Sequence, residues 1–327
     1  MRLRPRTNKG KASSELRRML RDESLPLLAI GGGTSHHAQL AEATGFKLFG
    51  LSGSQASAHI MGMPDSGIMT LTEVVENARR ICQAVSIPVI ADGETGFGNV
   101  LNATRTASDL INAGVAGFFI EDQVFPKRCG FTKGVEVVAA EEAAGKLRAA
   151  KAVRDELDPD VVLIARTDAR SAVGGGMDEV LRRCEIYLNA GVDMLLITAL
   201  QNREEIRKVR ERFPDASIEL NISGINPPLT MEEFRQFKIC IMTMPISKVA
   251  QIMMYDFLHA YRDRGLEVFN EFTEKNKRHP FGIFGFLELT GFPRLLEIEK
   301  QFLSSEQIAK YDQSIGIYDP RAEGKLS

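Results

Sequence analysis

Short apolar, β-branched runs alternate with longer amphipathic stretches along most of this 327-residue chain. Eight runs have this character, at residues 25–30, 46–51, 88–91, 117–120, 161–165, 194–198, 217–221 and 240–244. The stretches between them have helical spacing, for example at residues 71–85, 101–113, 141–157, 177–190 and 203–213. Eight strands followed by helical patterns predict an α/β fold, a parallel (β/α)8 barrel of the TIM type.

Glycine placement supports this alternation. Gly45, Gly114 and Gly191 stand where helices are predicted to end, just before the next strand, as glycine C-caps do. The alternative fold is an open, doubly wound sheet. It is disfavoured because the three glycines at 31–33 lack the GxGxxG spacing of a dinucleotide-binding turn.

Composition indicates a globular protein with ample material for a core. Apolar residues make up 44% of the chain, and the formal net charge of −2 favours neither a nucleic-acid partner nor a membrane surface. No apolar run is long enough to span a bilayer. We expect a basic N-terminal helix or extension over residues 1–22, the barrel over 23–264 and a C-terminal helical segment over 265–327.

The basic N-terminal stretch has two interpretations. An Arg-rich, Ser-containing start is typical of an organelle transit peptide, although it lacks the apolar core of a secretory signal. The helical spacing of Leu16, Met19 and Leu20, with Glu15 beside them, favours a surface helix that leads into the first strand. We therefore expect a helix and a cytoplasmic protein.

Polar and acidic residues gather where the predicted strands end. They are Ser52-Gly53-Ser54, Asp92-Gly93-Glu94, Glu121-Asp122 and Arg166-Thr167-Asp168, with Asp65 in the loop after the second strand. In a barrel these strand ends meet at one rim, where active sites form. Clustered carboxylates repel one another unless a cation neutralises them, and oxygen ligands suit Mg²⁺ or Mn²⁺. One such acid could simply cap a helix, but several on adjacent strands favour a metal site.

Arg166 ends an otherwise apolar predicted strand at residues 161–165. A guanidinium in that position needs a carboxylate partner. Spacing alone leaves two partners open, a neighbouring acid in a structural salt bridge or the carboxylate of a substrate.

The four cysteines are Cys82, Cys129, Cys184 and Cys240. They lack the CxxC spacing of a zinc site and do not form a disulfide pattern, which fits a reducing cytoplasm. Cys129 stands apart because Lys127 and Arg128 precede it in a connection, residues 126–134, with the Gly and Pro content of a mobile lid. Neighbouring cations favour the thiolate, so Cys129 is a candidate acid or base, although an idle loop thiol fits the spacing equally. The other three are expected to be core residues.

Four of these segments closely resemble the isocitrate lyase and phosphoenolpyruvate (PEP) mutase superfamily. They are Asp92-Gly93-Glu94-Thr95-Gly96-Phe97-Gly98-Asn99, Ile120-Glu121-Asp122-Gln123, Pro126-Lys127-Arg128-Cys129-Gly130 and Ala165-Arg166-Thr167-Asp168-Ala169. The similarity runs over about residues 25–300. It is strongest to the short bacterial-type members, which include 2-methylisocitrate lyase, 2,3-dimethylmalate lyase, oxaloacetate hydrolase and carboxyphosphonoenolpyruvate mutase.

The resemblance implies site residues and an assembly. Asp92 would bind Mg²⁺ directly, and Asp65, Glu94 and Glu121 would hold its water shell. The substrate-binding residues would be Ser52, Gly53, Ser54, Gly130, Arg166, Asn221 and Ser223. The catalytic residues would be Lys127, Cys129 and Arg166, with Cys129 on the lid as general acid or base. The family exchanges its eighth helix between paired subunits, so we expect a homotetramer, a dimer of dimers, in which the apolar segment 281–300 crosses to a partner.

Several positions depart from the family pattern. Gly93-Glu94 replaces the usual Ala-Asp after Asp92, and the tripeptide at 33–35 replaces Tyr-Asp-Ala. Phe131 stands where the lid usually has histidine, and Thr198 and Gly224 stand where glutamates are usual. These changes remove polar groups from the half of the pocket that would face the second product. We therefore expect a substrate with an alkyl group or a shorter chain, such as a 2-alkylmalate, rather than methylisocitrate.

The functional hypothesis is an Mg²⁺-dependent carbon–carbon lyase or hydrolase that acts on a small 2-oxo or 2-hydroxy dicarboxylate. A metal can stabilise the carbanion or alkoxide charge that such a reaction creates. One alternative is an enzyme that makes or breaks a phosphorus–carbon bond. A second is a barrel that binds an acid without turnover. Fold resemblance does not decide between them.

Overall fold

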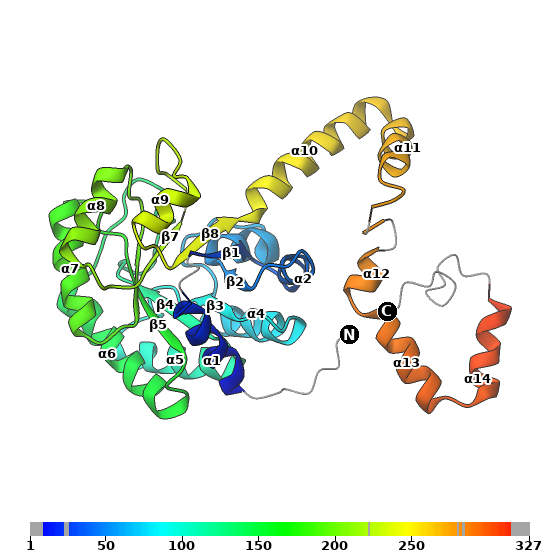
Figure 1. Cartoon of the computed structure of the whole chain (residues 1–327), viewed down its shortest axis with the longest axis horizontal. Coiled ribbons are helices and arrows are strands. Elements are labelled where there is room, and N and C mark those ends of the chain that lie inside the picture. The colour runs from blue at the N-terminus through cyan, green and yellow to red at the C-terminus, as the bar shows by residue number, and fades with distance from the viewer. Residues whose placement is uncertain (1–8, 23–25, 222, 280, 283–284, 315–327) are drawn as a thin grey trace. The chain divides into compact units, whose positions relative to one another are not determined.

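The computed structural model describes residues 9–22, 26–221, 223–279, 281–282 and 285–314. Across these residues eight parallel strands close into a barrel in chain order, and β8 pairs back with β1 (Figure 1). The strands are β1 Leu27–Gly32, β2 Leu48–Leu51, β3 Val89–Asp92, β4 Gly117–Glu121, β5 Val162–Thr167, β6 Met194–Ile197, β7 Ile218–Asn221 and β8 Ile241–Pro245. The predicted TIM-type barrel is confirmed, and each strand lies within two residues of its predicted bounds.

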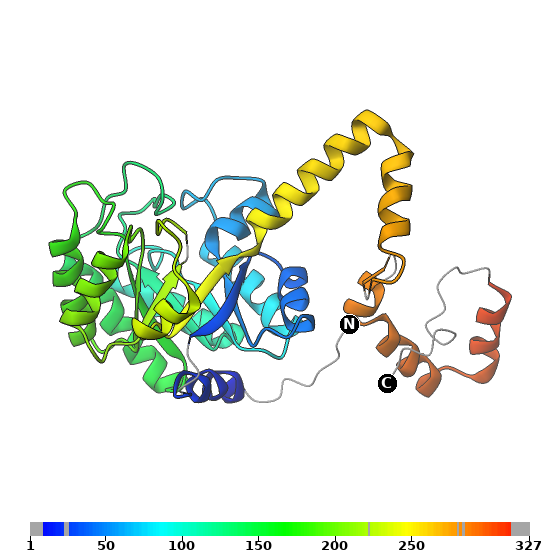
Figure 2. The ribbon, with the colours of Figure 1, turned by 45° about the horizontal axis from the view of Figure 1, so that its top comes forward.

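Helices follow the strands and surround the barrel, as the turned view of Figure 2 shows. They are α2 Ser35–Ala43, α4 Leu71–Ala84, α5 Val100–Ala113, α6 Ala140–Leu157, α7 Met177–Asn189, α8 Arg203–Arg212 and α9 Met231–Gln236. A short helix, α3 Gly53–Ala56, and a π-helix, η1 Ser57–Met61, come between β2 and α4. The predicted glycine caps are confirmed, because Gly45, Gly114 and Gly191 have φ of 92°, 100° and 86°.

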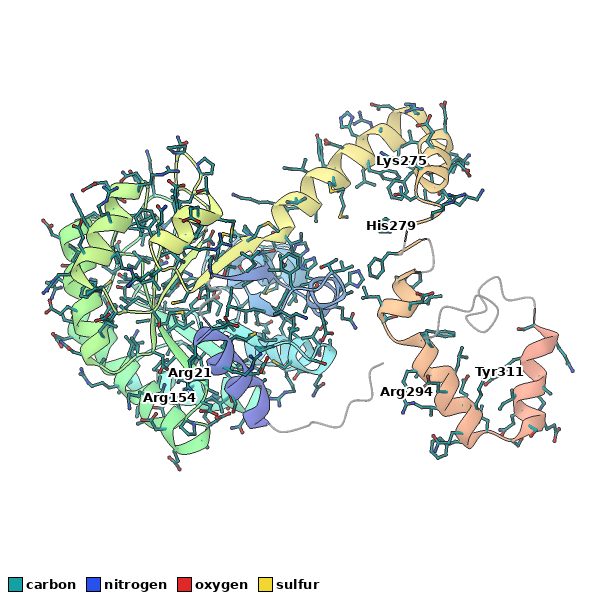
Figure 3. All side chains as sticks on the ribbon, in the orientation of Figure 1. Arg21, Arg154, Lys275, His279, Arg294 and Tyr311 are labelled. Carbon is teal, nitrogen blue, oxygen red and sulfur yellow. The ribbon has the colours of Figure 1, made fainter. Side chains whose placement is uncertain are left out.

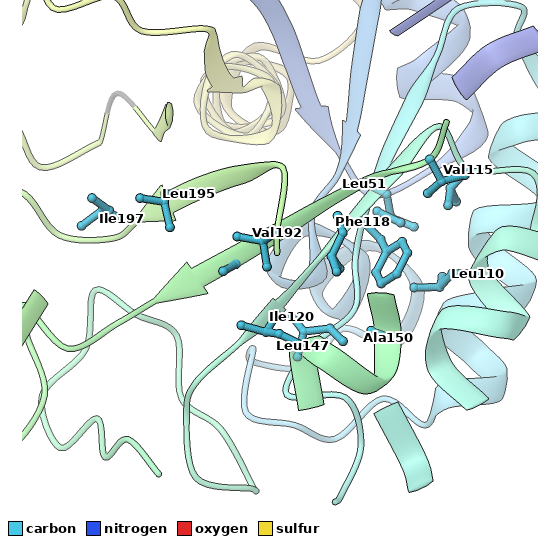
Figure 4. Packing of buried hydrophobic residues seen from close by; sticks show 14 of the residues in the cluster. Leu51, Leu110, Val115, Phe118, Ile120, Leu147, Ala150, Val192, Leu195 and Ile197 are labelled. Atoms are coloured by element: carbon cyan, nitrogen blue, oxygen red, sulfur yellow. The ribbon is translucent and has the colours of Figure 1, made fainter. Parts of the chain in front are cut away.

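Two layers of apolar side chains form the core. The outer layer packs between the helices and the outward face of the strands, and ten of its members are labelled in Figure 4. The inner layer fills the barrel and includes Ala29, Leu48, Ile90, Phe119, Val162, Ile164, Met194, Leu196 and Ile241. A barrel filled in this way has no channel, so its chemistry must take place at an end.

Helix α1, Lys9–Leu20, covers the end of the barrel where the strands begin. Leu16 and Met19 are buried in the inner layer. Arg17 pairs with Asp193, just before β6, at 2.9 Å. Arg154 of α6, labelled in Figure 3, pairs with the same aspartate. Loops form the opposite end of the barrel, where the strands finish.

A second compact unit begins at Lys248. Its helices are α10 Ile246–Arg264, which starts in the barrel unit, α11 Leu266–Lys275, α12 Gly285–Leu289, α13 Phe292–Phe302, α14 Ser305–Ala309 and a 3-10 turn, η2 Lys310–Gln313. The apolar segment 281–300 is not one continuous helix, because α12 ends before Gly291, whose φ of 93° cannot continue a helix. Residues 283–284 of that segment lie outside the described residues. Among the described helices, none combines the length and apolarity that a bilayer crossing requires.

Candidate active site

Charged side chains stand at the ends of three neighbouring strands. Asp92 is the last residue of β3 and Glu121 the last of β4, and both are buried. Glu121 is the register partner of Arg166 in β5, so their side chains share one face of the sheet. Arg166 Nη1 lies 2.9 Å from Glu121 Oε2. The structure thus brings these predicted residues together at the end of the barrel where the strands finish.

Asp92 is held in place by two backbone amides. The N–H of Gly53 donates to Oδ2 at 3.0 Å, and the N–H of Glu94 donates to Oδ1 at 2.9 Å. Glu94 has a φ of 53°, a left-handed conformation that is rare for a residue with a side chain and typical of functional sites. Its carbonyl accepts from the N–H of Glu121 at 2.9 Å, which ties the loop after β3 to the end of β4.

Two carboxylates converge beside Gly53. A Cβ atom on this glycine would lie closer than 3.0 Å to oxygens of both Asp92 and Glu94. Burial and the charge of Asp92 raise the pKa of Glu94 to about 8, although Lys127 opposes this rise. Burial also raises the pKa of Glu121 well above its usual value. These acids need positive charge close by to stay ionised.

A Gly53→Ala variant should therefore disturb the Mg²⁺ site that the sequence predicts here. The new methyl group would push the carboxylates of Asp92 and Glu94 out of position, and displaced ligand geometry typically costs about 10- to 100-fold in metal affinity or activity. Gly50→Ala is the matched control, because its Cβ would meet nothing nearer than 3.7 Å. Mg²⁺ binding by calorimetry should separate the two variants. Equal affinities would show that Gly53 does not limit the site.

Lys127 supplies positive charge from the loop after β4. Its Nζ lies 2.7 Å from Asp65, 3.0 Å from Glu94 and 3.9 Å from Glu121. Its side chain is only 1% exposed. Burial alone would lower the pKa of Lys127, but the surrounding carboxylates outweigh burial and raise it well above its usual value. Lys127 therefore stays protonated and joins Asp65, on a different loop, to the acids at the strand ends.

Arg166 has acidic partners on both sides. Besides Glu121, its Nε and Nη2 lie 3.0 Å from the two carboxylate oxygens of Asp168, and Nε also donates to Thr198 Oγ1 at 3.2 Å. Its guanidinium stands over the ring of Phe119 at 5.8 Å. Of the two partners that the sequence left open, the structure shows the neighbouring acids. The guanidinium has five N–H groups, and the contacts described above use one on each of its three nitrogen atoms. The remaining N–H groups can donate to a substrate carboxylate.

Asp122, next to Glu121, belongs to a different environment. It accepts hydrogen bonds from Tyr187 at 2.8 Å, Arg183 at 3.1 Å and Thr167 at 2.7 Å. Successive strand residues point to opposite faces, so Glu121 faces the barrel interior and Asp122 faces the helices. These hydrogen bonds hold α7 against the barrel. Asp122 is therefore not part of the acid cluster, by which we mean Asp65, Asp92, Glu94 and Glu121.

The loop after β4 packs over the strand ends, and we call residues 124–138 the lid. Val124 N donates to Glu136 O at 2.9 Å, and Ser171 Oγ donates to Gly130 O at 3.1 Å. A Cβ on Gly130 would collide with Asp168 and Thr198, so the lid lies directly on the Arg166–Asp168 pair. Cys129 is half-buried between Lys127 and Gly130, the two lid residues that contact the site.

Apolar groups border the lid on the side of β6 and β7. Phe131 lies against Gly224, where a Cβ would be 3.4 Å from its ring. Phe131 is 49% exposed, whereas Thr198 and Ile225 are buried. Two of the positions that the sequence singled out as unusual, Phe131 and Gly224, therefore lie near each other, and a side chain at position 224 would contact the ring of Phe131.

The remaining predicted substrate-binding residues lie at the ends of β2 and β7. The hydroxyl groups of Ser52 and Ser54 share a hydrogen bond of 3.0 Å. The amide oxygen of Asn221 accepts from the N–H of Ser223 at 2.9 Å. The N–H of Gly53 is used by Asp92, so it is not free to bind a substrate carboxylate in this arrangement.

Sequence reasoning missed one buried acid, Glu219 in β7. It is 6% exposed, and burial raises its pKa to about 7. The sequence feature that could have revealed Glu219 is a single acidic residue inside the apolar run at 217–221. As the side chains stand, the described residues contain no group of three His, Cys, Asp or Glu side chains that could surround a metal ion. Three carboxylates instead converge on Lys127.

Comparison with known proteins now identifies the family. The family model described as phosphoenolpyruvate phosphomutase matches residues 22–261. The chain belongs to this PEP mutase family. The 2,3-dimethylmalate lyase of Eubacterium barkeri is 33% identical over 89% of this chain and 98% of its own length. The 2-methylisocitrate lyase of Escherichia coli K12 is 38% identical over 68% of this chain and 74% of its own length.

Solved structures of the same superfamily share the fold. Oxaloacetate acetylhydrolase with the inhibitor 3,3-difluorooxalacetate superposes with a TM-score of 0.77 at 27% identity, covering 89% of this chain and 96% of the other. Phosphonopyruvate hydrolase in complex with oxalate and Mg²⁺ gives 0.76 at 30% identity, covering 90% and 100%. The PEP mutase family match and these structures confirm the superfamily expected from the motifs. They span lyases, hydrolases and mutases, so they leave the reaction of this chain to be proposed.

Proposed function

We propose that this member of the PEP mutase family is an Mg²⁺-dependent carbon–carbon lyase or hydrolase that acts on a small 2-oxo or 2-hydroxy dicarboxylate. One observation carries the proposal. Three acids converge on Lys127, one from the loop after β3, one from the end of β4 and one from a separate loop, and Arg166 pairs with the acid of β4. Such a site can hold negative charge on a reacting oxygen.

The donor set fits a hard divalent cation, because every candidate ligand is a carboxylate oxygen and two carboxylates already converge beside Gly53. Asp92 would bind the ion directly, and Asp65, Glu94 and Glu121 would hold its water shell, with Mn²⁺ as the alternative ion. When bound, the metal would draw electron density from the oxygen on C2 of the substrate. The Mg²⁺ in the related phosphonopyruvate hydrolase supports this choice.

The chain's own residues would bind the substrate and move the proton. The free N–H groups of Arg166 would hold a substrate carboxylate, and the hydroxyl groups of Ser52 and Ser54 would hold the 2-oxo acid end. The C2 hydroxyl, which hydration of the ketone would supply in a 2-oxo substrate, would give its proton to one of the buried carboxylates. Its oxygen would form the new C=O bond as the carbon–carbon bond breaks, and the electron pair of the broken bond would remain on the carbon next to a carboxylate. The thiol of Cys129 would protonate that carbon while the lid excludes water.

A Cys129→Ser variant tests the proton-transfer role. Serine keeps the shape of the side chain but is a far weaker acid, so turnover should fall by roughly two orders of magnitude. Mg²⁺ and substrate affinity should stay the same, because among the described residues no hydrogen bond or ion pair joins the thiol to the acidic side chains around Lys127. The measurement is kcat together with KM for the best substrate. An unchanged kcat would remove Cys129 from the mechanism.

The ring of Phe131 faces Gly224, which has no side chain, so this border of the lid carries no charge and supports a substrate with an alkyl group. The deciding experiment is a screen of oxaloacetate, 2-alkylmalates and methylisocitrate with Mg²⁺, in which pyruvate, glyoxylate and oxalate are followed as products. We expect turnover of a 2-alkylmalate or of oxaloacetate. Efficient cleavage of methylisocitrate would contradict the substrate assignment. Binding without turnover of any of these acids would contradict the enzyme assignment.

A phosphorus–carbon enzyme is the second candidate. The observation in its favour is the structural similarity to phosphonopyruvate hydrolase at 30% identity. Phosphorus NMR of the products from phosphonopyruvate distinguishes the two reactions. A new phosphate or phosphate-ester signal would favour this candidate, and an unchanged spectrum would favour the carbon–carbon reaction.

We further propose a homotetramer in which the C-terminal unit packs on a second copy of the chain. Many large apolar side chains of α10 and α11 are exposed, including Ile252 at 64%, Met253 at 68% and Leu266 at 67%. Apolar area of this kind is typical of a subunit interface. Light scattering during gel filtration tests the assembly, and a monomer at micromolar concentration would contradict it.

A further inference from the structure

Glu219 lies inside the barrel and below its mouth. Its register partners are Leu196 in β6 and Ile241 in β8, which both belong to the apolar layer that fills the barrel. Register partners share a face of the sheet, so Glu219 also faces the interior. A carboxyl group is therefore buried among apolar side chains, where an ionised group is costly.

One of the two carboxyl oxygens of Glu219 has no partner among the described residues. The hydroxyl of Thr243 donates to Oε1 at 2.8 Å. Oε2 is fully buried and accepts no hydrogen bond. A charged oxygen in this state loses its hydration without compensation, whereas a proton on Oε2 removes the charge.

Arg166 lies in the same row of the barrel interior as Glu219. Arg166 in β5 is the register partner of Leu196 in β6, and Leu196 is the register partner of Glu219 in β7. The other residues that the strands beside β7 present, Ile241 and Thr243, carry no charge. Burial raises the pKa of Glu219 to about 7, although the Thr243 hydrogen bond and Arg166 oppose this rise. Since Arg166 also pairs with Glu121 and Asp168, only part of its charge supports an ionised Glu219.

We propose that Glu219 takes up a proton when an anionic ligand binds at Arg166, so that substrate binding and protonation of Glu219 are coupled. The coupling rests on the proposed function, because it requires an anion at Arg166. The ligand's negative charge cancels the field that favours the ionised carboxylate. The proton comes from solvent and remains on Glu219 while the ligand is bound. Glu219 is thus a positioning residue that acts through Arg166. Once Glu219 is neutral, it no longer competes with the ligand for the positive charge of Arg166.

Proton uptake can be measured with oxalate and the magnesium-saturated protein. Calorimetry at about pH 7.5, in buffers with different ionisation enthalpies, gives the number of protons bound per site. The wild type should take up roughly half to three-quarters of a proton more than Glu219→Gln, in which the amide mimics the neutral acid, because roughly a quarter of Glu219 is already protonated at this pH when its pKa is about 7. Glu205→Gln is the matched control, because Glu205 pairs with Arg170 at 2.7 Å, and it should behave as the wild type. Equal uptake by the wild type and Glu219→Gln overturns the coupling.

Thermal unfolding without ligand provides a second readout. A carboxyl group whose folded pKa is raised contributes stability that is complete below the unfolded pKa of about 4.3 and is lost as pH rises through about 7. The Tm of Glu219→Gln should therefore rise relative to that of the wild type between about pH 5 and pH 8. A constant Tm difference overturns the proposal. Failure of oxalate to bind the magnesium-saturated wild type would contradict the proposed function as well, whereas normal binding without the extra uptake overturns the coupling alone.

Discussion

An Arg166→Met variant should lose both most of its stability margin and nearly all of its activity. Glu121 and Asp168 are fully buried, and each has Arg166 as an ion-pair partner within 3.0 Å. Removal of one member of a buried ion pair typically costs roughly 3–5 kcal/mol, because the charge that remains is uncompensated. Loss of the donor for the substrate carboxylate should lower kcat/KM by a further factor of roughly 10²–10³.

The stability loss should depend on pH in a definite direction. The charge of Arg166 lowers the pKa of Glu121 against the effect of burial, so without it that pKa rises further. A raised carboxyl pKa means that stability is complete at low pH and lost as pH rises through the folded pKa. Urea unfolding should therefore show a smaller difference between variant and wild type at about pH 5 than at about pH 8. A deficit that grows on acidification would contradict this electrostatic account.

Two further variants separate charge from geometry. Arg166→Lys keeps the positive charge and should retain more stability than Arg166→Met, but it loses the planar fork and should still have low activity. Arg182→Met is the surface control, since Arg182 is 53% exposed and pairs with Glu179. Such exposed pairs contribute roughly 0–1 kcal/mol. Equal losses for Arg166→Met and Arg182→Met would show that burial of Arg166 does not determine its contribution.

The fold was predictable because it follows from local periodicity. All eight strands carry short apolar runs, and glycines at 45, 114 and 191 mark helix ends where no other residue fits as well. The break at Gly291 could be found by the same reasoning, but the sequence interpretation treated 281–300 as one apolar segment and did not divide it. Apolar content predicts burial, whereas glycine position predicts where a helix ends.

The candidate site was only partly predictable, because its contacts join loops that are far apart in sequence. The pattern indicated that Asp92, Glu121 and Arg166 share a rim, since strand ends do so in every barrel. It could not show that Lys127 reaches Asp65 and Glu94, because that contact depends on two loop conformations. Strand alternation could have separated Glu121 from Asp122, and the sequence interpretation did not apply it.

A Lys127→Met variant should bind Mg²⁺ more tightly and yet turn over substrate poorly. Lys127 Nζ contacts three carboxylates that would also serve the metal. Its removal leaves the cluster more negative, and charges a few ångströms apart in a buried site interact by several kcal/mol, so Mg²⁺ affinity should rise by about tenfold or more. The lid loses its anchor to Asp65 and Glu94, so kcat/KM should fall by roughly three orders of magnitude.

Lys133→Met is the control, because Lys133 lies on the same lid and is exposed. It should leave both Mg²⁺ affinity and kcat/KM unchanged. Calorimetric titration with Mg²⁺ and steady-state kinetics on the best substrate measure the two effects separately. If Lys127→Met bound Mg²⁺ more weakly than the wild type, Lys127 would support the metal through the arrangement of its carboxylates instead of opposing it through charge. If activity survived with tighter metal binding, the lid would not need Lys127 to close over the substrate.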